Sequence, residues 1–147
     1  GWKDMEDART QMAYGLSVCD ILKISDNEIQ WFSGKEDYTE GIHMLQQTYQ
    51  IPLILLSMGK DGSRAYYKDM LVEVPAFLQK NTIETTGAGD TFGACCLHHI
   101  LKYGLDNLTK QQLKEMLTFA NAAASIITTR KGALRVMPSL EEIQRLL

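Results

Sequence analysis

Long apolar runs, a charge excess and a cysteine framework are all missing from this 147-residue sequence, and each absence excludes a class of protein. Even the longest apolar runs are short, such as residues 53–56, so no membrane-spanning helix is expected. Fifteen lysines and arginines against 18 aspartates and glutamates leave a net charge of −3. The chain therefore has no excess of positive charge with which to attract nucleic acid or an anionic membrane. Three cysteines, two of them adjacent, make no disulfide framework. A charged, amphipathic opening segment is unlike a secretory signal, so we expect a cytoplasmic protein.

What remains is the composition of an ordinary globular domain. Apolar residues make up 45% of the chain and charged residues 22%, which argues against disorder. A chain of this length buries roughly two thirds of its unfolded surface. We therefore expect residues 1–147 to form a single domain without linkers or repeats.

Apolar periodicity predicts helices and strands in alternation. Helical spacing and capping patterns predict helices over 4–18, 25–32, 37–50, 90–103 and 109–127, with a short one starting at 138. Short apolar or alternating runs predict strands over 21–24, 53–56, 65–67 and 71–74, the last two as a hairpin. The continuous run at 53–56 is typical of a parallel strand covered on both faces. The predicted class is α/β, with a mainly parallel sheet and a small antiparallel hairpin at one edge.

The segment 85–92, Thr-Thr-Gly-Ala-Gly-Asp-Thr-Phe, carries the most chemical information. Glycines at the start of a helix let an anion approach the free N–H groups of the first turn. Asp90 in that same turn would repel a bound phosphate, unless its carboxylate accepts a proton from an alcohol while the N–H groups stabilise a transferring phosphoryl. The alternative is that Asp90 only complements the helix dipole, which an acidic first-turn residue does by itself.

Two familiar phosphate loops do not fit this segment. The sequence contains no G-x-x-x-x-G-K-[ST] motif, so a Walker-type loop is excluded. Gly87, Gly89 and Gly93 loosely match a dinucleotide fingerprint, but their spacing is G-x-G-x-x-x-G and no strand ending in an acidic residue follows. A dinucleotide-dependent oxidoreductase therefore stays a weak alternative hypothesis for the function, and it predicts that the chain binds NAD(P).

Taken together, five motifs make the chain similar to the ribokinase-like (PfkB) carbohydrate kinases, and to fructokinases among them. The resemblance rests on residues 84–92, 56–62, 119–124, 129–133 and 23–28, which occur in the family's order. It covers nearly the whole chain but only about half of the family's usual length, the C-terminal half that binds ATP. It implies a three-layer αβα fold, and it implies that the sugar-binding half and its β lid are absent.

The resemblance also implies roles for individual residues. Asp90 would be the catalytic base, and Gly87, Ala88 and Gly89 would supply the N–H groups of the anion hole. The ATP-binding residues would be Ser25, Ser57, Met58, Gly59, Lys60, Asp61, Gly62 and Asn121. Glu28 would hold waters on Mg²⁺, and a K⁺ site would be formed by Glu84, Thr86, Ile127, Arg130 and Gly132.

The chain departs from the family pattern at two of these positions. Ser25 stands where the metal-linked motif usually has Asn, and Glu84 stands where the family usually has Asp. Ser25 and Glu28 also match a capping box, which gives Glu28 a purely structural alternative role.

The function implied is an ATP-dependent carbohydrate kinase acting on a small sugar, with fructose as the expected substrate. The alternative is a nucleotide-binding module without kinase activity, because the sugar-binding half is missing. An uncovered sheet edge would favour self-association, so a homodimer is expected.

A second cluster, Cys95, Cys96, His98 and His99, lies on one predicted helix. Cys95 and His99 share a helix face, which makes a metal site geometrically possible. No second Cys/His cluster supplies further ligands, so small thiols packed in the core are the favoured interpretation.

Overall fold

The computed structural model describes residues 1–77, 87–127 and 140–147. Its helices are α1 (Trp2–Val18), α2 (Asp26–Ser33), α3 (Tyr38–Thr48), the 3-10 turn η1 (Gly59–Asp61), α4 (Ala88–Tyr103), α5 (Lys110–Ile127) and α6 (Leu140–Leu146). Its strands are β1 (Ile21–Ser25), β2 (Leu53–Ser57), β3 (Ser63–Tyr67) and β4 (Met70–Val74).

The four strands form one mixed sheet in the order β1-β2-β3-β4. β1 and β2 pair in parallel, with Ile21 opposite Leu53 and Ser25 opposite Ser57. β2 pairs antiparallel with β3, and β3 with β4, so the hairpin forms one edge. The parallel part of the sheet is thus confined to β1 and β2 within the described residues, while the predicted hairpin at the edge is confirmed.

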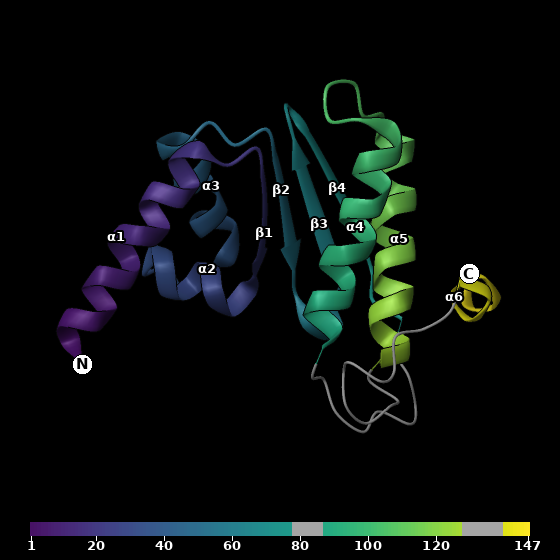
Figure 1. Ribbon diagram of the computed structural model, residues 1–147, viewed down its shortest axis with the longest axis horizontal. Helices are drawn as coiled ribbons and strands as arrows, with labels where there is room; N and C mark the ends of the chain where they lie inside the picture. Colours follow the sequence, from purple (N-terminus) through teal and green to yellow (C-terminus); the bar gives the residue numbers. More distant parts are fainter. Residues whose placement is uncertain (78–86, 128–139) are drawn as a thin grey trace.

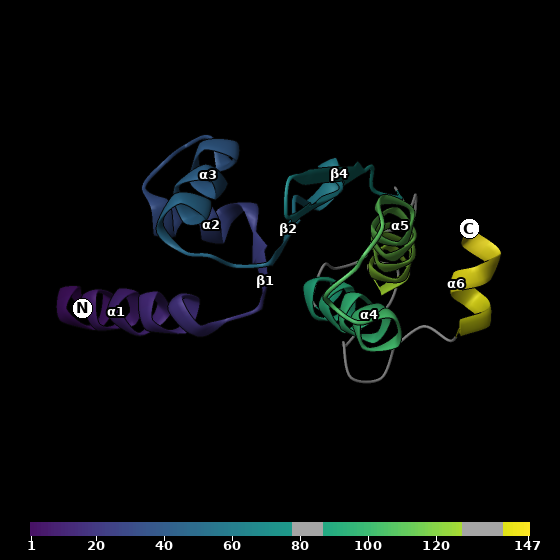
Figure 2. The same ribbon diagram turned by 90° about the horizontal axis from the view of Figure 1, so that it is seen from above.

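Helices cover both faces of this sheet (Figures 1 and 2). One apolar cluster joins Leu53 and Leu55 of β2 to the buried residues of α4 and α5. Another joins Ile54 and Leu56 of the same strand to α1, α2 and α3. Alternate residues of β2 therefore enter opposite layers, as the period of two in a strand requires. The three-layer α/β arrangement is confirmed.

Local signals account for where two of the helices begin. Ser25 accepts a hydrogen bond from the N–H of Glu28 at 3.2 Å, and the Ser25 N–H donates to the Glu28 carboxylate at 3.1 Å. Thr109 and Gln112 make the same reciprocal pair at the start of α5, at 2.9 and 3.1 Å. These two predicted capping boxes are confirmed, and each satisfies two backbone donors that a helix start leaves unpaired. The third predicted one, Ser139 with Glu142, involves a residue outside the described ranges.

Within the described ranges, none of the helices combines the length and the apolar character that crossing a bilayer requires.

Candidate functional site

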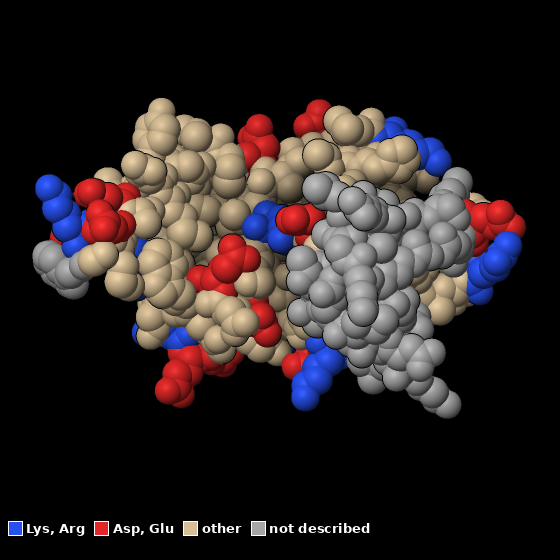
Figure 3. Space-filling view, turned by 60° about the horizontal axis from the view of Figure 1, so that its bottom comes forward, with Lys and Arg blue, Asp and Glu red and all other residues tan. Residues whose placement is uncertain are grey.

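The predicted site residues that the structure describes gather at one end of the sheet. β1 and β2 both end there, at Ser25 and Ser57. The start of α4 lies at the same end, since a β-carbon added at Gly89 would stand 3.3 Å from the Nζ of Lys23 on β1. Figure 3 looks toward this end, where acidic and basic side chains meet beside the residues that are not described. Ligands of α/β proteins characteristically bind outside the carboxyl ends of parallel strands.

The first turn of α4 offers unpaired backbone donors. Gly87 precedes the helix in the left-handed conformation, with φ of 83°, and no side chain caps the helix. The first helical bond runs from the N–H of Thr91 to the Gly87 carbonyl, at 2.9 Å. The N–H groups of Ala88, Gly89 and Asp90 have no acceptor in the described part of the chain. Together with the helix dipole, they form a place where an anion is stabilised.

The Asp90 carboxylate is exposed at the edge of this place. Among the described residues it has no hydrogen-bond or ion-pair partner. The next two residues, Thr91 and Phe92, are buried at 2% and 3% exposure and anchor the turn in the core. The carboxylate is thus held beside the free N–H groups while remaining accessible to a substrate.

The turn after β2 is a second glycine-bearing segment at this end of the sheet. Its backbone is closed by hydrogen bonds from the N–H of Met58 to the Gly62 carbonyl (2.8 Å) and from the N–H of Gly62 to the Gly59 carbonyl (3.1 Å). Gly62 has φ of 98°, and a β-carbon there would stand 2.2 Å from the Val74 carbonyl oxygen. Only glycine fits that position, because the conformation and the space both exclude a side chain.

The side chains of this turn point in different directions. Met58 is 2% exposed and packs into the cluster between the sheet and α1–α3, so only its backbone can face a ligand. Lys60 and Asp61 are exposed. Ser57, at the end of β2, is half-buried between its strand partners Ser25 and Ser63.

Of the two roles that the sequence left open for Glu28, the structure shows the capping box, and the metal role stays a prediction. One of its carboxylate oxygens accepts a hydrogen bond from the Ser25 N–H in the capping box. Glu28 is exposed, and its other carboxylate oxygen has no partner among the described residues. Within the described ranges, no three acidic, histidine or cysteine side chains converge on a metal position. A single carboxylate such as Glu28 could contact Mg²⁺ only together with waters and substrate phosphates.

Asn121 lies in the protein interior rather than on an open surface. Its residue is 8% exposed, and its amide nitrogen donates to the carbonyls of Val74 and Pro75 at 3.2 and 3.1 Å. The side chain therefore ties α5 to the end of β4, and its carbonyl oxygen is the part left for another partner.

The structure describes only one of the five residues assigned to the K⁺ site. Ile127 is buried at the last position of α5. Glu84, Thr86, Arg130 and Gly132 lie outside the described residues.

The cysteine and histidine cluster on α4 has the features of core packing. Cys96 is fully buried, and burial raises the pKa of its thiol far above the ordinary value. Burial also raises the pKa of the neighbouring Cys95 thiol. A ring nitrogen of His99 lies 3.1 Å from the Cys95 carbonyl, and its ring packs on Phe119. Thiols that resist ionisation are poor metal ligands.

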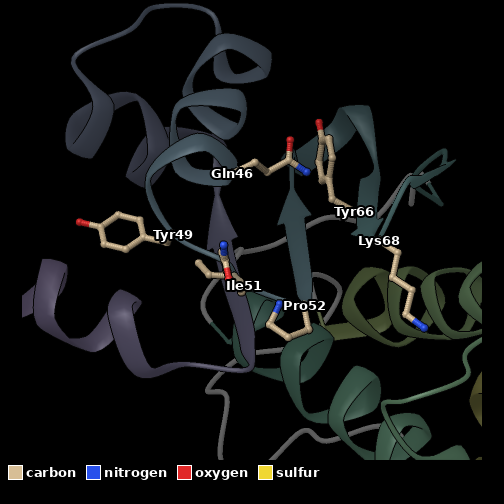
Figure 4. A pocket seen from close by; sticks show the side chains of 7 residues that line it. Gln46, Tyr49, Ile51, Pro52, Tyr66 and Lys68 are labelled. Carbon is tan, nitrogen blue, oxygen red and sulfur yellow. The ribbon is translucent and has the colours of Figure 1, made fainter.

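A pocket of about 280 Å³ lies at the opposite end of the sheet (Figure 4). It is lined by Gln46, Tyr49, Gln50, Ile51, Pro52, Tyr66 and Lys68. These residues precede β2 or belong to the end of β3 and the turn after it, so the pocket is separate from the first turn of α4.

Sequence reasoning gave no role of its own to one residue at the site, Lys23. Its signal was present: a single lysine interrupts the otherwise apolar run at 21–24. Its side chain extends along α4 to the first turn.

Comparison with known proteins places this geometry in a family. The model of the pfkB family of carbohydrate kinases matches residues 2–140. Fructokinase-1 of Zea mays is 32% identical over 146 residues, and the fructokinase of Klebsiella pneumoniae is 33% identical over 145. These alignments cover 99% and 98% of this chain but 45% and 46% of the relatives, so the chain spans about half the length of the curated relatives it matches.

Solved structures give the same picture. A fructokinase from Vibrio cholerae, in a form bound to fructose, ADP and calcium, superposes with a TM-score of 0.86 at 25% identity, covering 97% of this chain and 45% of that one. The aminoimidazole riboside kinase of Salmonella enterica, complexed with its riboside and an ATP analogue, superposes with a TM-score of 0.83 at 23% identity, covering 96% and 46%.

Proposed function

The chain belongs to the pfkB family of carbohydrate kinases, and from that membership we propose that it forms the ATP-binding and phosphoryl-transferring part of a sugar kinase. The proposed acceptor is a hydroxyl of fructose, because the sequence relatives at 32% and 33% identity are fructokinases. The observation that carries the proposal is the first turn of α4, where unpaired N–H groups and the exposed Asp90 carboxylate lie side by side.

The proposed chemistry uses the two features together. The Asp90 carboxylate accepts the proton of the sugar hydroxyl, and the hydroxyl oxygen forms a bond to the γ-phosphorus of ATP. The bond from that phosphorus to the oxygen bridging the β- and γ-phosphates breaks, and ADP leaves. The N–H groups of Ala88 and Gly89 stabilise the charge on the transferring group. Since the transition state of phosphoryl transfer is loose, positioning and charge stabilisation are the main contributions that the protein makes.

The remaining residues would position the nucleotide. The glycine turn at 57–62 and Ser25 edge the same end of the sheet, and they are proposed to contact ATP through backbone groups and hydroxyls. Mg²⁺ would neutralise phosphate charge when bound, with the free oxygen of Glu28 holding its waters. Asn121 is proposed to act on the nucleotide through its carbonyl oxygen alone, since its nitrogen is engaged. The K⁺ site and a homodimer also stay predictions.

The second candidate is a nucleotide-binding module without kinase activity. The observation in its favour is the length of the match, because the chain covers 45% and 46% of the Zea mays and Klebsiella pneumoniae fructokinases. In this case the first turn of α4 would hold phosphates, and Asp90 would have no hydroxyl to deprotonate.

One assay separates the two candidates. ADP release from ATP and Mg²⁺ is measured with this chain, with and without fructose, alongside direct titration of ATP. Fructose-dependent ADP release supports the kinase. ATP binding without fructose-dependent release supports the module. The absence of ATP binding contradicts both.

A further inference from the structure

Lys23 stands on the sheet face that α4 and α5 cover, between Ile21 and Ser25 of β1. Its register partner on β2 is Leu55, and two residues earlier Ile21 is opposite Leu53. Both leucines are buried in the cluster between the sheet and α4–α5, and Ile21 packs against it. Because alternate residues of a strand share a face, Lys23 points into this layer, and its side chain is half-buried there.

The Lys23 side chain packs along α4 at two glycines. A β-carbon at Gly93 would stand 3.5 Å from the Cδ of Lys23, and a β-carbon at Gly89 would stand 3.3 Å from its Nζ. Gly89 and Gly93 are four residues apart and share one helix face. A β-carbon at Gly93 would make ordinary contact with the Lys23 stem, and the tighter contact at Gly89 falls on the ammonium end of the side chain, so the two distances trace the course of Lys23 along α4. The aliphatic stem passes Gly93, and the ammonium group emerges at the first turn.

The ammonium group is not neutralised by a salt bridge within the described residues. It lies instead beside the N-terminal end of α4, which is the positive end of the helix dipole and where cations are disfavoured. The two sources of positive potential meet beside the exposed Asp90 carboxylate, with which Lys23 forms no ion pair, so they are available to a ligand that carries several negative charges.

We propose that Lys23 binds the terminal phosphates of ATP from the strand side, opposite the N–H groups of Ala88 and Gly89. This inference rests on the proposed function and adds a residue to it. Lysine suits the position because its ammonium is a compact point charge with three donors, which can follow a phosphate group as it is transferred. The packing against Gly89 and Gly93 positions the charge, so these glycines act through Lys23 as well as through their own backbone.

The test compares nucleotides with different numbers of phosphates. AMP, ADP and ATP are titrated calorimetrically into the wild-type chain and into Lys23→Met, which keeps the length of the apolar stem. Loss of a hydrogen bond to a charged group predicts that the Kd for ATP rises about 10- to 100-fold, while the Kd for AMP changes less than about twofold. Lys114→Met, at an exposed position of α5, removes the same charge elsewhere and should leave all three values unchanged.

The outcomes distinguish this inference from the function on which it rests. If the wild-type chain binds ATP and Lys23→Met binds it equally well, the role of Lys23 is wrong and the nucleotide site stands. If the wild-type chain binds no nucleotide, the proposed function itself is wrong. Should Lys23→Met unfold, Lys23→Gln carries the same prediction with a polar side chain, and a thermal melt shows which variant is folded. An equal loss for AMP and ATP would mean a purely structural role.

Discussion

The two ends of the sheet differ in whether their polar groups have hydrogen-bond partners within the protein. At the end where β2 begins, polar groups are paired: the Tyr67 hydroxyl donates to the Leu105 carbonyl at 2.5 Å and accepts the Leu108 N–H at 3.3 Å. Lys68 donates to the Asp106 carbonyl at 2.8 Å. At the end where β2 finishes, the first N–H groups of α4 are free and the Asp90 carboxylate is exposed.

This difference is the basis for proposing the ligand site at the α4 end and a structural role for the Tyr67 end. Buried polar groups are normally satisfied within the protein, and the Tyr67 end follows that rule. The α4 end keeps donors available and uses glycines at positions with positive φ, such as Gly62 and Gly87. A pocket of about 280 Å³ lies at the Tyr67 end, whereas the α4 end carries the N–H groups and the carboxylate on which the proposed phosphoryl transfer depends.

The largest expected effect comes from removing the Asp90 carboxylate. Asp90→Asn should lower fructose-dependent ADP release by about 10²- to 10⁴-fold, the contribution typical of a general base. ATP affinity should change little, because the N–H groups of the turn remain. Steady-state kinetics and ATP titration measure both. Turnover within a few-fold of wild type would contradict the role of Asp90 as base.

A next effect, on stability, belongs to the turn at the same end. Gly62→Ala forces a β-carbon against the Val74 carbonyl and should destabilise the fold by about 3 kcal/mol. Gly34 is the matched control, because its φ is 70° and nothing lies within 4 Å of an added β-carbon. Gly34→Ala should cost only about 1 kcal/mol. Urea unfolding gives both values, and equal losses would show that close packing at Gly62 is irrelevant.

At the opposite end, Tyr67→Phe removes a hydroxyl that joins β3 to the segment before α5. The unpaired Leu105 carbonyl and Leu108 N–H should then cost about 1–3 kcal/mol. ATP affinity should not change, since this end is separate from α4's first turn. A loss of nucleotide affinity that exceeds the loss of stability would mean that the two ends are coupled.

The smallest effect is expected at Ser63, whose hydroxyl is the one buried side-chain polar atom without a hydrogen-bond partner among the described residues. Ser63→Ala removes an unsatisfied polar atom without leaving a partner behind, so stability should rise by about 1 kcal/mol. Thermal unfolding tests this, and a lower Tm would show that the hydroxyl is satisfied in solution.

Short-range patterns in the sequence predicted a large part of the fold. Capping boxes at Ser25 and Thr109 predicted helix starts correctly, because those hydrogen bonds join residues three apart. The hairpin also follows from local alternation. The extent of the parallel pairing did not, because it depends on which distant strands meet, and within the described residues only β1 and β2 pair in parallel.

The site was predictable where its chemistry is local and unpredictable where it is assembled by packing. Residues 87–90 are contiguous, so their motif alone indicated an anion site. The engagement of Asn121 with Val74 and Pro75 joins segments 46 and 47 residues apart, and no local pattern indicates it. Lys23 meets Gly89 across the interface between β1 and α4, so its relation to the site needed the tertiary structure.

The most direct test of the central claim is a nitrogen–proton correlation spectrum of the ¹⁵N-labelled chain during titration with ATP and with AMP. We expect the amide signals of Ala88, Gly89 and Asp90 to move with ATP and to move far less with AMP, because the terminal phosphates contact those N–H groups. Unchanged signals at these three residues with saturating ATP, or changes centred on the pocket between Gln46 and Lys68, would contradict a phosphate site at the start of α4.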